Sequence, residues 1–591
     1  MNVQGLAAAP KLERPGQTSF LASYLQHWAS ATPEQVAITY LDYDADRRGV
    51  ARSVSYGELD RWVRALAARI DQLTSPGDRV ALLAPQGIEY GAGFAAAVSS
   101  QAIGVPLFAP DLLGQGDRLQ SVVADCEPAV LLTTRAKLEL VRAFAVDHDI
   151  AEERILAIDD YREGPDALVA QYGFPADRTL DDVAYLQYTS GSTRIPVGVE
   201  LTHRNLVDNV LQIREAFDIE FANATTVSWL PLFHDMGLVL GVASPMVGGL
   251  ESVLLDPVAF ILKPLRWLQA IDGRKNVMTA APNFAFDFVA KRVRPDDRDG
   301  LDLSGVTGWI NGAEPVLPST LERFVTTFAA NGVTPSAVKA TYGLAEATVF
   351  VATSPLPEAS RVIQVDSEQL QQGVVTQEIT SDMRPTTLVS CGRPVGQHLA
   401  IVDPATRELL PSKRVGEIWL HGSNIGAGYW QRPDDTETLF NAKLVGGGPD
   451  LPGDRWLRTE DLGVMVDGEF YVTGRIKDLI IIDGRNIYPH DVEYTVEEAH
   501  EAIAQRRLAA FSIPTDGGEA LVVVAERYRH AGDASEQIAE IAAAARAAVS
   551  QEHAVALHDF VLIEPDTIAR TSSGKIARKA TRTAYLAGEL A

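Results

Sequence analysis

The chain has 591 residues, more than one hydrophobic core usually serves, so two or more domains are expected. Its formal charge of −26, from 52 basic and 78 acidic side chains, argues against nucleic acid or an anionic membrane as the main partner. A hydrophobic content of 46% is typical of a soluble globular protein. Cys126 and Cys391, the only cysteines, give no disulfide framework or metal-site spacing and suit a reducing, cytoplasmic setting.

Strand and helix patterns alternate through the first third of the chain. Strands are predicted at residues 37–41, 79–83, 125–134, 154–158 and 183–188. Ser55 followed by Glu58 predicts a capped helix start. This alternation indicates an α/β fold with a largely parallel sheet. Residues 1–16 lack the apolar core of a signal peptide, and polar residues interrupt the most apolar stretch, 91–109, so no membrane insertion is expected.

A loop of small residues follows the strand at 183–188. It consists of Thr189, Ser190, Gly191, Ser192 and Thr193. Small residues let the backbone approach a ligand closely, and the hydroxyls add donors, so the loop suits a phosphate chain. An ordinary turn between two strands is the alternative. The loop is not a Walker A loop, because no Gly-Lys-Ser/Thr closes it.

A second group of polar residues follows the strand predicted at 225–230. There Phe233 precedes His234 and Asp235. A His-Asp pair after a strand is either catalytic or a satisfied loop pair, and the residues alone leave both open. Further on, residues 280–286 contain two phenylalanines that either line an apolar tunnel or pack in the core.

Two motifs about 30 residues apart suit a nucleotide base and its phosphates. The first follows a strand predicted at 307–310 and comprises Asn311, Gly312, Ala313 and Glu314. A strand that ends in Gly-Ala lets a flat base lie against the backbone. In the second motif Tyr342, followed by Gly343, supplies a face for an adenine, and Glu346 can hold Mg²⁺ on the phosphates.

The connection from Glu346 to Gly392 spans 46 positions, and residues 354–390 within it are polar and irregular. Loops of this length inside a compact domain are commonly functional, although a plain surface loop is the alternative. From about Lys477 a small α/β domain is predicted, with strands at 509–513 and 521–525 and an Ala-rich helix at 534–552. Lys575 follows on a Ser/Gly loop, where a lysine is normally just solvated.

In this order the motifs resemble those of the adenylate-forming superfamily, which includes acyl-CoA ligases, luciferases and peptide-synthetase adenylation domains. The resemblance covers about residues 19–587 and at least seven motifs. It implies a large N-terminal domain, residues 1–476, with parallel-rich sheets, helices and a β-subdomain. A small mobile C-terminal α/β domain, residues 477–591, would carry the catalytic lysine.

The resemblance also implies residue roles. Lys575 would stabilise the α-phosphate of ATP, Glu346 would hold Mg²⁺, and His234 would lie beside the acyl pocket. The nucleotide would contact Thr189, Ser190, Gly191, Ser192, Thr193, Asn311, Gly312, Ala313, Glu314, Tyr342, Gly343, Asp461 and Arg475. Asp461 lies in a run similar to the ribose motif. The chain departs from the family pattern at Arg194, Val197 and Glu460.

Residues 354–390 resemble the extra segment that separates fatty acyl-AMP ligases from fatty acyl-CoA ligases. In that branch the segment packs against the C-terminal domain and hinders the swing needed for CoA transfer. The resemblance implies an enzyme that uses ATP and Mg²⁺ to convert a medium- or long-chain fatty acid to acyl-AMP. The acyl group would pass to a separate acyl carrier protein or a polyketide synthase carrier domain. The alternatives are a fatty acyl-CoA ligase and a non-catalytic nucleotide-binding partner of a synthase complex.

Overall fold

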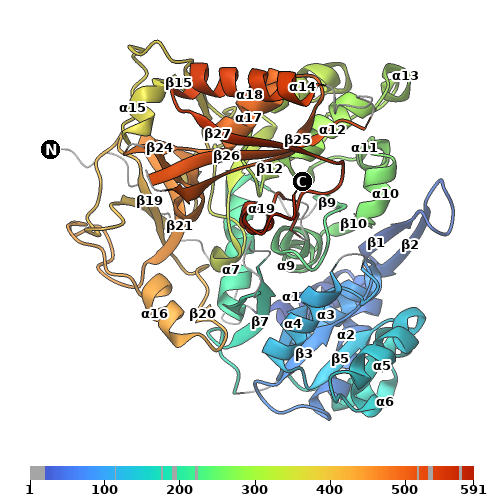
Figure 1. The fold of residues 1–591 in the computed structure, drawn as a ribbon. Coiled ribbons are helices and arrows are strands. Elements are labelled where there is room, and N and C mark those ends of the chain that lie inside the picture. The colour runs from blue at the N-terminus through green and yellow to red at the C-terminus, as the bar shows by residue number, and fades with distance from the viewer. Residues whose placement is uncertain are drawn as a thin grey trace.

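Two large sheets organise the computed structural model (Figure 1). The structure describes residues 20–112, 115–174, 177–189, 196–219, 224–482, 484–515, 518–529, 537–571 and 575–590. Ser190, Gly191, Ser192, Thr193 and Arg194, at which the sequence predicts a phosphate loop and one family departure, lie outside the described residues. The α/β fold predicted from the alternating pattern is confirmed.

The first sheet has the order β20-β8-β7-β4-β3-β5-β6. Its strands are β3 (Arg79–Leu82), β4 (Ile103–Pro106), β5 (Val130–Thr133), β6 (Ile155–Ala157), β7 (Val183–Tyr188), β8 (Gly198–Thr202) and β20 (Gly428–Tyr429). The pairs from β6 to β7 are parallel, and β8 runs antiparallel to β7. Strand β7 therefore ends at the same edge as the other parallel strands of this sheet.

The second sheet has the order β17-β14-β13-β12-β11-β9-β10-β1-β2. Its strands are β1 (Val36–Asp42), β2 (Val50–Ser55), β9 (Thr225–Ser228), β10 (Glu251–Leu255), β11 (Val277–Pro282), β12 (Val306–Gly312), β13 (Val338–Tyr342), β14 (Ala352–Thr353) and β17 (Arg393–Pro394). Strands β9, β11, β12 and β13 are parallel, so the loops after them emerge at one edge. Ligands bind at this edge in open α/β sheets.

Local sequence signals explain most element boundaries. Helix α2 (Tyr56–Asp71) begins with the predicted capping box, in which Ser55 accepts from the N–H of Glu58 while the Glu58 carboxylate accepts from the N–H of Ser55. The strand predicted at 125–134 begins too early, because helix α4 (Gly116–Cys126) continues through Cys126 on an apolar face. Strand β2 was not predicted. It pairs antiparallel with β1 and is mostly exposed, so it lacks an apolar signal.

A β-subdomain and the predicted extra segment follow the second sheet. The subdomain has the order β18-β19-β21-β22 and comprises β18 (His398–Val402), β19 (Gly416–His421), β21 (Leu457–Val466) and β22 (Glu469–Arg475). The extra segment is ordered and contains β15 (Val362–Val365), α15 (Ser367–Gln371) and β16 (Thr386–Val389). Asp366 caps α15 and accepts from the backbone N–H groups of Gln369, Thr380 and Ser381. Burial alone would raise the pKa of Asp366, but these donors hold it well below the usual range.

The C-terminal elements have an apolar core of their own. They comprise β23 (Ile480–Ile482), β24 (Arg485–Ile487), α17 (Pro489–Ala499), β25 (Ile503–Thr515), β26 (Gly518–Arg527), α18 (Ile538–His553), β27 (Leu557–Ile563) and α19 (Arg578–Leu586). We call residues 477–591 the small domain and residues 1–476 the large domain, as the sequence predicts. Figure 1 shows α17 and α18 beside α14 (Pro318–Phe328) at one end and near α15 at the other.

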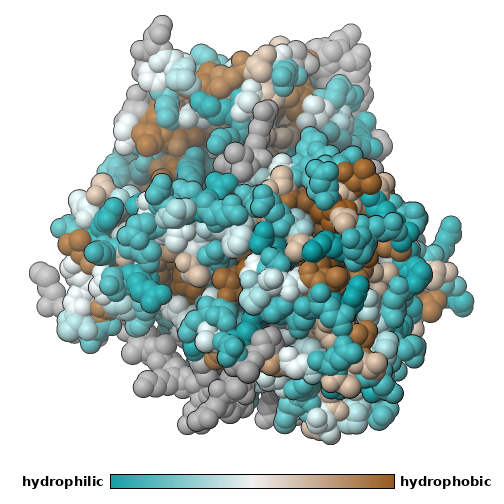
Figure 2. Space-filling model, turned by 90° about the horizontal axis from the view of Figure 1, so that it is seen from below, coloured by the Kyte–Doolittle hydropathy of each residue, from teal (hydrophilic) through white to brown (hydrophobic). Residues whose placement is uncertain are grey.

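The surface agrees with the acidic, polar composition. Figure 2 shows mostly hydrophilic residues on the face seen from below, with apolar residues in separate small patches. Among the described residues, no helix combines the length and the apolar character that crossing a bilayer requires.

Candidate functional site

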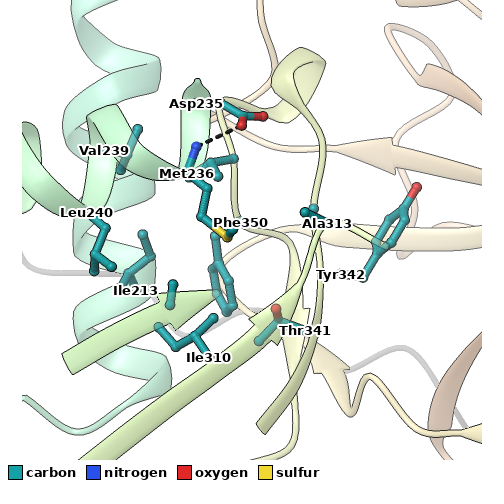
Figure 3. A pocket seen from close by; sticks show the side chains of 13 residues that line it. Ile213, Asp235, Met236, Val239, Leu240, Ile310, Ala313, Thr341, Tyr342 and Phe350 are labelled. Atoms are coloured by element: carbon teal, nitrogen blue, oxygen red, sulfur yellow. Dashed lines mark hydrogen bonds between the residues drawn. The ribbon is translucent and has the colours of Figure 1, made fainter. Parts of the chain in front are cut away.

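A pocket opens where β11, β12 and β13 end (Figure 3). It is lined by Ile213, Asp235, Met236, Val239, Leu240, Ala280, Ile310, Ala313, Thr341, Tyr342, Gly343, Val349 and Phe350. One wall comes from α8 (Asp235–Leu238) and the π-helical turn η5 (Val239–Ala243), a geometry common at functional sites. In Figure 3, Tyr342 and Ala313 lie at one side, and apolar side chains lie across from them.

The polar side of the pocket leads to a hydrogen-bonded group around Asp461. The hydroxyl of Tyr342 donates to Asp461 Oδ2 at 2.8 Å, and Arg475 Nε donates to Asp461 Oδ1 at 2.7 Å. Burial, reinforced by the Asp461 charge, raises the pKa of Tyr342 well above its usual value, so the phenol stays protonated and donating. Each Asp461 oxygen keeps a lone pair that can accept a further hydrogen bond.

The two motifs that the sequence predicts for the nucleotide base, at 311–314 and at 342–346, have backbones that lie close to their neighbours. A Cβ at Gly312 would lie 2.5 Å from Thr341 Oγ1, and one at Gly343 would lie 1.6 Å from the Val349 carbonyl oxygen. Ala313 has a positive φ of 64°, which is costly for a residue with a Cβ and is typical of ligand sites. Asn311 is buried, and none of the described residues donates a hydrogen bond to its Oδ1. That oxygen can accept a hydrogen bond from a ligand.

Glu346 lies on the loop after β13. Tyr429 donates its hydroxyl proton to Glu346 Oε1 at 2.8 Å, and the N–H of Gly426 donates to the Glu346 main-chain oxygen at 2.9 Å. Burial raises the pKa of Glu346, while the Tyr429 hydrogen bond and the charge of Arg475 act in the opposite direction. The described residues contain no group of three or more His, Cys, Asp or Glu side chains that could hold a metal by themselves. A single carboxylate fits Mg²⁺, which is usually bound by one or two carboxylates together with waters and substrate phosphates.

Lys575 reaches this pocket from the small domain. Burial lowers the pKa of its ammonium group, the nearby charge of Arg475 lowers it further, and Asp235, Glu314 and Asp461 act to raise it. Asp235 lines the pocket and Asp461 borders it, so the lysine is near enough to this site for their charges to act on it. Its loop is closed by the Thr571 N–H, which donates to the Lys575 carbonyl at 2.8 Å. The fold therefore unites Lys575 with residues up to 340 positions earlier in the chain.

The sequence also predicts roles for His234, for Thr189 and for residues 280–286. His234 is the N-cap residue of α8, directly before the pocket-lining Asp235, and its ring contacts Phe233 at 4.8 Å between centroids. At Thr189 the carbonyl accepts from Arg118 Nη2 at 3.0 Å. The tunnel interpretation of residues 280–286 is wrong for Phe286, which packs edge-on in an aromatic core cluster. Ala280 is the member of that stretch that lines the pocket.

Sequence reasoning missed the apolar end of the pocket and the partner of Glu346. Ile213, Leu240 and Phe350 occupy positions that look like ordinary core residues, because a buried pocket wall and a core carry the same apolar pattern. Tyr429 was visible only as part of the Gly-rich turn at 426–430. It lies in β20, the antiparallel partner of β8, where it contacts Glu346, and no local sequence signal marks that contact.

The extra segment contacts the small domain at two places. Arg384 forms ion pairs of 3.4 Å with both Glu498 and Glu552, and its guanidinium lies 6.0 Å from the centre of the Tyr494 ring. Gln371 Nε2 donates to the His553 carbonyl at 3.4 Å. Apolar contacts add to these, because the segment shares one buried cluster with the β-subdomain and Tyr488. Its members are Ile363, Val365, Leu370, Val375, Leu388, Leu462, Val464, Val466, Tyr471 and Tyr488.

Comparisons with known proteins agree with this architecture. The family described as AMP-binding enzyme matches residues 25–430, and the AMP domain of Disco-interacting protein 2-like proteins matches residues 477–591. The chain is similar to the long-chain-fatty-acid–AMP ligase FadD26 of Mycobacterium bovis, with 39% identity covering 95% of this chain and 96% of the relative. It is 38% identical to a 4-hydroxyphenylalkanoate adenylyltransferase of Mycobacterium tuberculosis, covering 96% and 92%. A fatty acyl-adenylate ligase structure from L. pneumophila with acyl adenylate and pyrophosphate superposes with a TM-score of 0.72, 32% identity and 96% coverage of each chain.

Proposed function

The chain belongs to the AMP-binding enzyme family, within it to the long-chain-fatty-acid–AMP ligases, and from this we propose how its pocket performs the reaction. The enzyme joins a fatty acid to AMP and releases pyrophosphate. A carboxylate oxygen of the fatty acid attacks the α-phosphorus of ATP, a new O–P bond forms, and the bond to pyrophosphate breaks with its electron pair. The observation that supports the residue assignment is the hydrogen-bonded group of Tyr342, Asp461 and Arg475 beside the pocket. The charges of Arg475 and Asp461 also act on Lys575.

At the α-phosphate, charge stabilisation falls to Lys575 and Arg475. The phosphate oxygens gain negative charge as the carboxylate attacks, and a fixed ammonium group in a water-poor site stabilises that charge strongly. Thr189 to Thr193 would hold the β- and γ-phosphates, and His234 would help place the fatty-acid carboxylate. Mg²⁺, held by Glu346 and the phosphates, would neutralise phosphate charge when bound. Two free, buried cysteines support a reducing, cytoplasmic location.

The nucleotide would lie across Tyr342, with its base against residues 311–314 and its ribose hydroxyls on Asp461. This assignment predicts that Asp461→Asn raises the KM for ATP by about 10–100-fold, because hydrogen bonds to a charged group contribute about 1.5–3 kcal/mol. The KM for fatty acid should change little. Steady-state pyrophosphate release at varied ATP and varied fatty acid separates the two effects. Asp467→Asn, in the turn after β21, is the control, and an equal rise in both KM values would contradict the assignment.

The acyl chain would extend from Asp235 toward Phe350, which lines the apolar part of the pocket. The backbone of Phe350 is fixed, since its N–H donates to Asn209 Oδ1 at 3.0 Å and its carbonyl accepts from Asn209 Nδ2 at 2.8 Å and from Gln397 Nε2 at 3.3 Å. A buried side chain on so constrained a backbone moves little, so its size would limit chain length.

We expect Phe350→Leu to shift the preferred fatty acid toward longer chains. Each additional buried methylene contributes about 0.8 kcal/mol, which corresponds to about fourfold in kcat/KM. A panel of saturated fatty acids of increasing length measures the shift. Phe286→Leu is the matched control, since Phe286 is buried in the core outside the pocket lining and its loss should lower stability without moving the preference. An unchanged preference in the Phe350 variant would show that chain length is set elsewhere.

The acyl-AMP would then pass to the phosphopantetheine thiol of a separate acyl carrier protein or polyketide synthase carrier domain. The contacts of residues 354–390 with the small domain support this over CoA transfer, because they oppose the domain rotation that CoA transfer needs. The deciding experiment supplies ATP and a fatty-acid panel with and without CoA and separates acyl-AMP from acyl-CoA. Acyl-AMP without acyl-CoA is expected. Efficient acyl-CoA formation would instead identify a fatty acyl-CoA ligase, and the absence of both products a non-catalytic nucleotide-binding protein.

A further inference from the structure

An ion-pair interface joins the two domains away from the extra segment. On the large domain, Asp287 of α12 (Asn283–Arg292) is buried and is paired with Lys291 at 2.9 Å and with Arg323. From β25 of the small domain, Arg506 Nη2 lies 3.6 Å from Asp287 Oδ2 and donates to Thr320 Oγ1 at 3.3 Å. Figure 1 shows β25 next to α12 and α14.

The same contact has a second hydrogen bond and complementary charges. Lys291 Nζ donates to Gln505 Oε1 at 2.9 Å, so neighbouring residues of β25 both bind α12. Glu497 of α17 lies close enough to Lys291 and Arg506 for both charges to lower its pKa against the rise that burial causes. Opposite charges therefore alternate across the interface, which favours one docking position over others.

Arg506 is held in an unusual conformation. Its φ is +56°, in the left-handed region that residues with a Cβ rarely occupy. Glu497 Oε2 accepts from its N–H at 2.7 Å, and its carbonyl accepts from Arg570 Nη2 at 3.3 Å. Such a conformation persists only where the surroundings fix it, so the Arg506 side chain is presented to Asp287 in a defined direction.

Arg570 connects this interface to the catalytic loop. The backbone of Arg570 forms an antiparallel β-bridge with Ile576. Between these two residues, the N–H of Thr571 donates a hydrogen bond to the carbonyl of Lys575. A continuous series of contacts thus runs from Asp287 through Arg506 and Arg570 to the loop that ends at Lys575. We infer that Arg506 is a positioning residue that docks the small domain on Asp287 and so places Lys575 at the pocket for adenylation.

This inference rests on the proposed function. It adds that Arg506 matters for acyl-AMP formation and not for the later transfer of the acyl group. The Asp287 contact belongs to the domain arrangement of this structure, in which Lys575 would act at the α-phosphate, whereas acyl transfer takes place at the carbonyl carbon of acyl-AMP. Removing Arg506 should therefore slow acyl-AMP formation and spare transfer. Asp287 would keep Lys291 and Arg323 as partners, so the large domain should stay folded.

The test compares Arg506→Gln with Arg507→Gln. Arg507 is the adjacent residue of β25 and pairs within the small domain, with Glu526 at 3.5 Å and Asp566 at 3.3 Å. We expect Arg506→Gln to lower the kcat of acyl-AMP formation by about tenfold with nearly unchanged KM values, the effect of losing one partly buried charge pair. Transfer from supplied acyl-AMP to pantetheine should keep its rate. Arg507→Gln should change the rate of neither step. Arg506→Lys should retain most of the rate of acyl-AMP formation.

A structural readout keeps this test separate from the proposed function. Glu322 on α14 and Glu540 on α18 are exposed, and cysteines there can carry a donor and an acceptor fluorophore. Arg506→Gln should reduce the population with the two domains docked, and Arg507→Gln should leave it as in the parent protein. Equal loss of both half-reactions, no loss of either, or an unchanged docked population would overturn the inference. Absence of acyl-AMP with the parent protein would refute the proposed function, while the fluorescence comparison would still decide the docking role.

Discussion

Replacing Lys575 with alanine is expected to reduce the rate of acyl-AMP formation by about 10²–10³-fold, the usual cost of losing one preorganised charge contact to a transition state. The small domain carries this lysine, and the charges of Asp235, Glu314 and Asp461 act on its ammonium group. Without it, these carboxylates would leave the α-phosphate in a negative environment. The loss should appear in kcat more than in the KM for ATP, because the phosphate gains charge as the reaction proceeds.

Pyrophosphate release and direct detection of acyl-AMP measure this loss. Lys579→Ala is the matched control, since Lys579 is exposed on α19 four residues later. Both variants should retain the parent melting temperature within a few degrees, because a lysine in a polar pocket contributes little net burial energy. Near-parental pyrophosphate release by the Lys575 variant would refute the assignment.

The pH dependence of the parent enzyme gives a second readout for Lys575. The protonated amine is the form that stabilises phosphate charge. Burial, aided by Arg475, lowers the pKa of Lys575 below the ordinary lysine value of 10.5. Activity should therefore fall as pH rises through this lowered pKa, at a lower pH than an exposed lysine would give. This alkaline limb should be absent from the residual activity of Lys575→Ala.

The sequence predicted the parts of the site that depend on chemically distinctive residues in fixed order. Tyr342, Asp461, Arg475 and Lys575 are recognisable because few other residue types do their chemistry. The structure joins the first three by hydrogen bonds, and their roles stay predictions, as does that of Lys575. The apolar wall was not predictable, because Phe350 as a pocket residue and Phe286 as a core residue carry the same local pattern. Only the three-dimensional arrangement of the strands distinguishes them.

The departure at Glu460 shows why a motif difference need not disable a site. Glu460 has a φ of +59°, in the region where the glycine usual at this position would be relaxed. Its carboxylate pairs with Lys477 Nζ at 2.6 Å, at the junction of the two domains. The neighbouring Asp461 keeps its contacts with Tyr342 and Arg475. The backbone shape that glycine would favour is therefore retained with a charged side chain directed at the hinge.

Removal of the extra segment is expected to make acyl-CoA appear as a product. The strand pairing decides which residues to delete. Deleting residues 356–384 alone would leave β16 without its partner β15. Replacing residues 356–388 with a short Gly-Ser linker removes β15 and all of β16 except Val389. Its ends lie near each other, since β14 and β17 pair antiparallel with Ala352 opposite Pro394. Acyl-AMP formation should persist, because the pocket residues lie outside the deletion.

The amount of acyl-CoA that each variant forms depends on which contacts of the extra segment hold the small domain. The Arg384 ion pairs are half-exposed, and such pairs contribute about 0–1 kcal/mol each. The apolar cluster contributes more, at about 1.5–3 kcal/mol for each fully buried side chain. Most of it belongs to the extra segment and the β-subdomain, and the small domain adds the buried Tyr488 and the partly buried Leu479. Arg384→Ala should therefore release little acyl-CoA and the deletion much more.

Chromatographic separation of acyl-AMP from acyl-CoA, at equal concentrations of folded protein, measures both variants. The deletion also exposes apolar residues of β21 and β22, so a lower melting temperature is expected and must be measured alongside. If the folded deletion variant still forms only acyl-AMP, the segment does not restrain the small domain, and the pocket or the carrier surface must exclude CoA instead. If Arg384→Ala alone gives as much acyl-CoA as the deletion, the ion pairs rather than the apolar cluster provide the restraint.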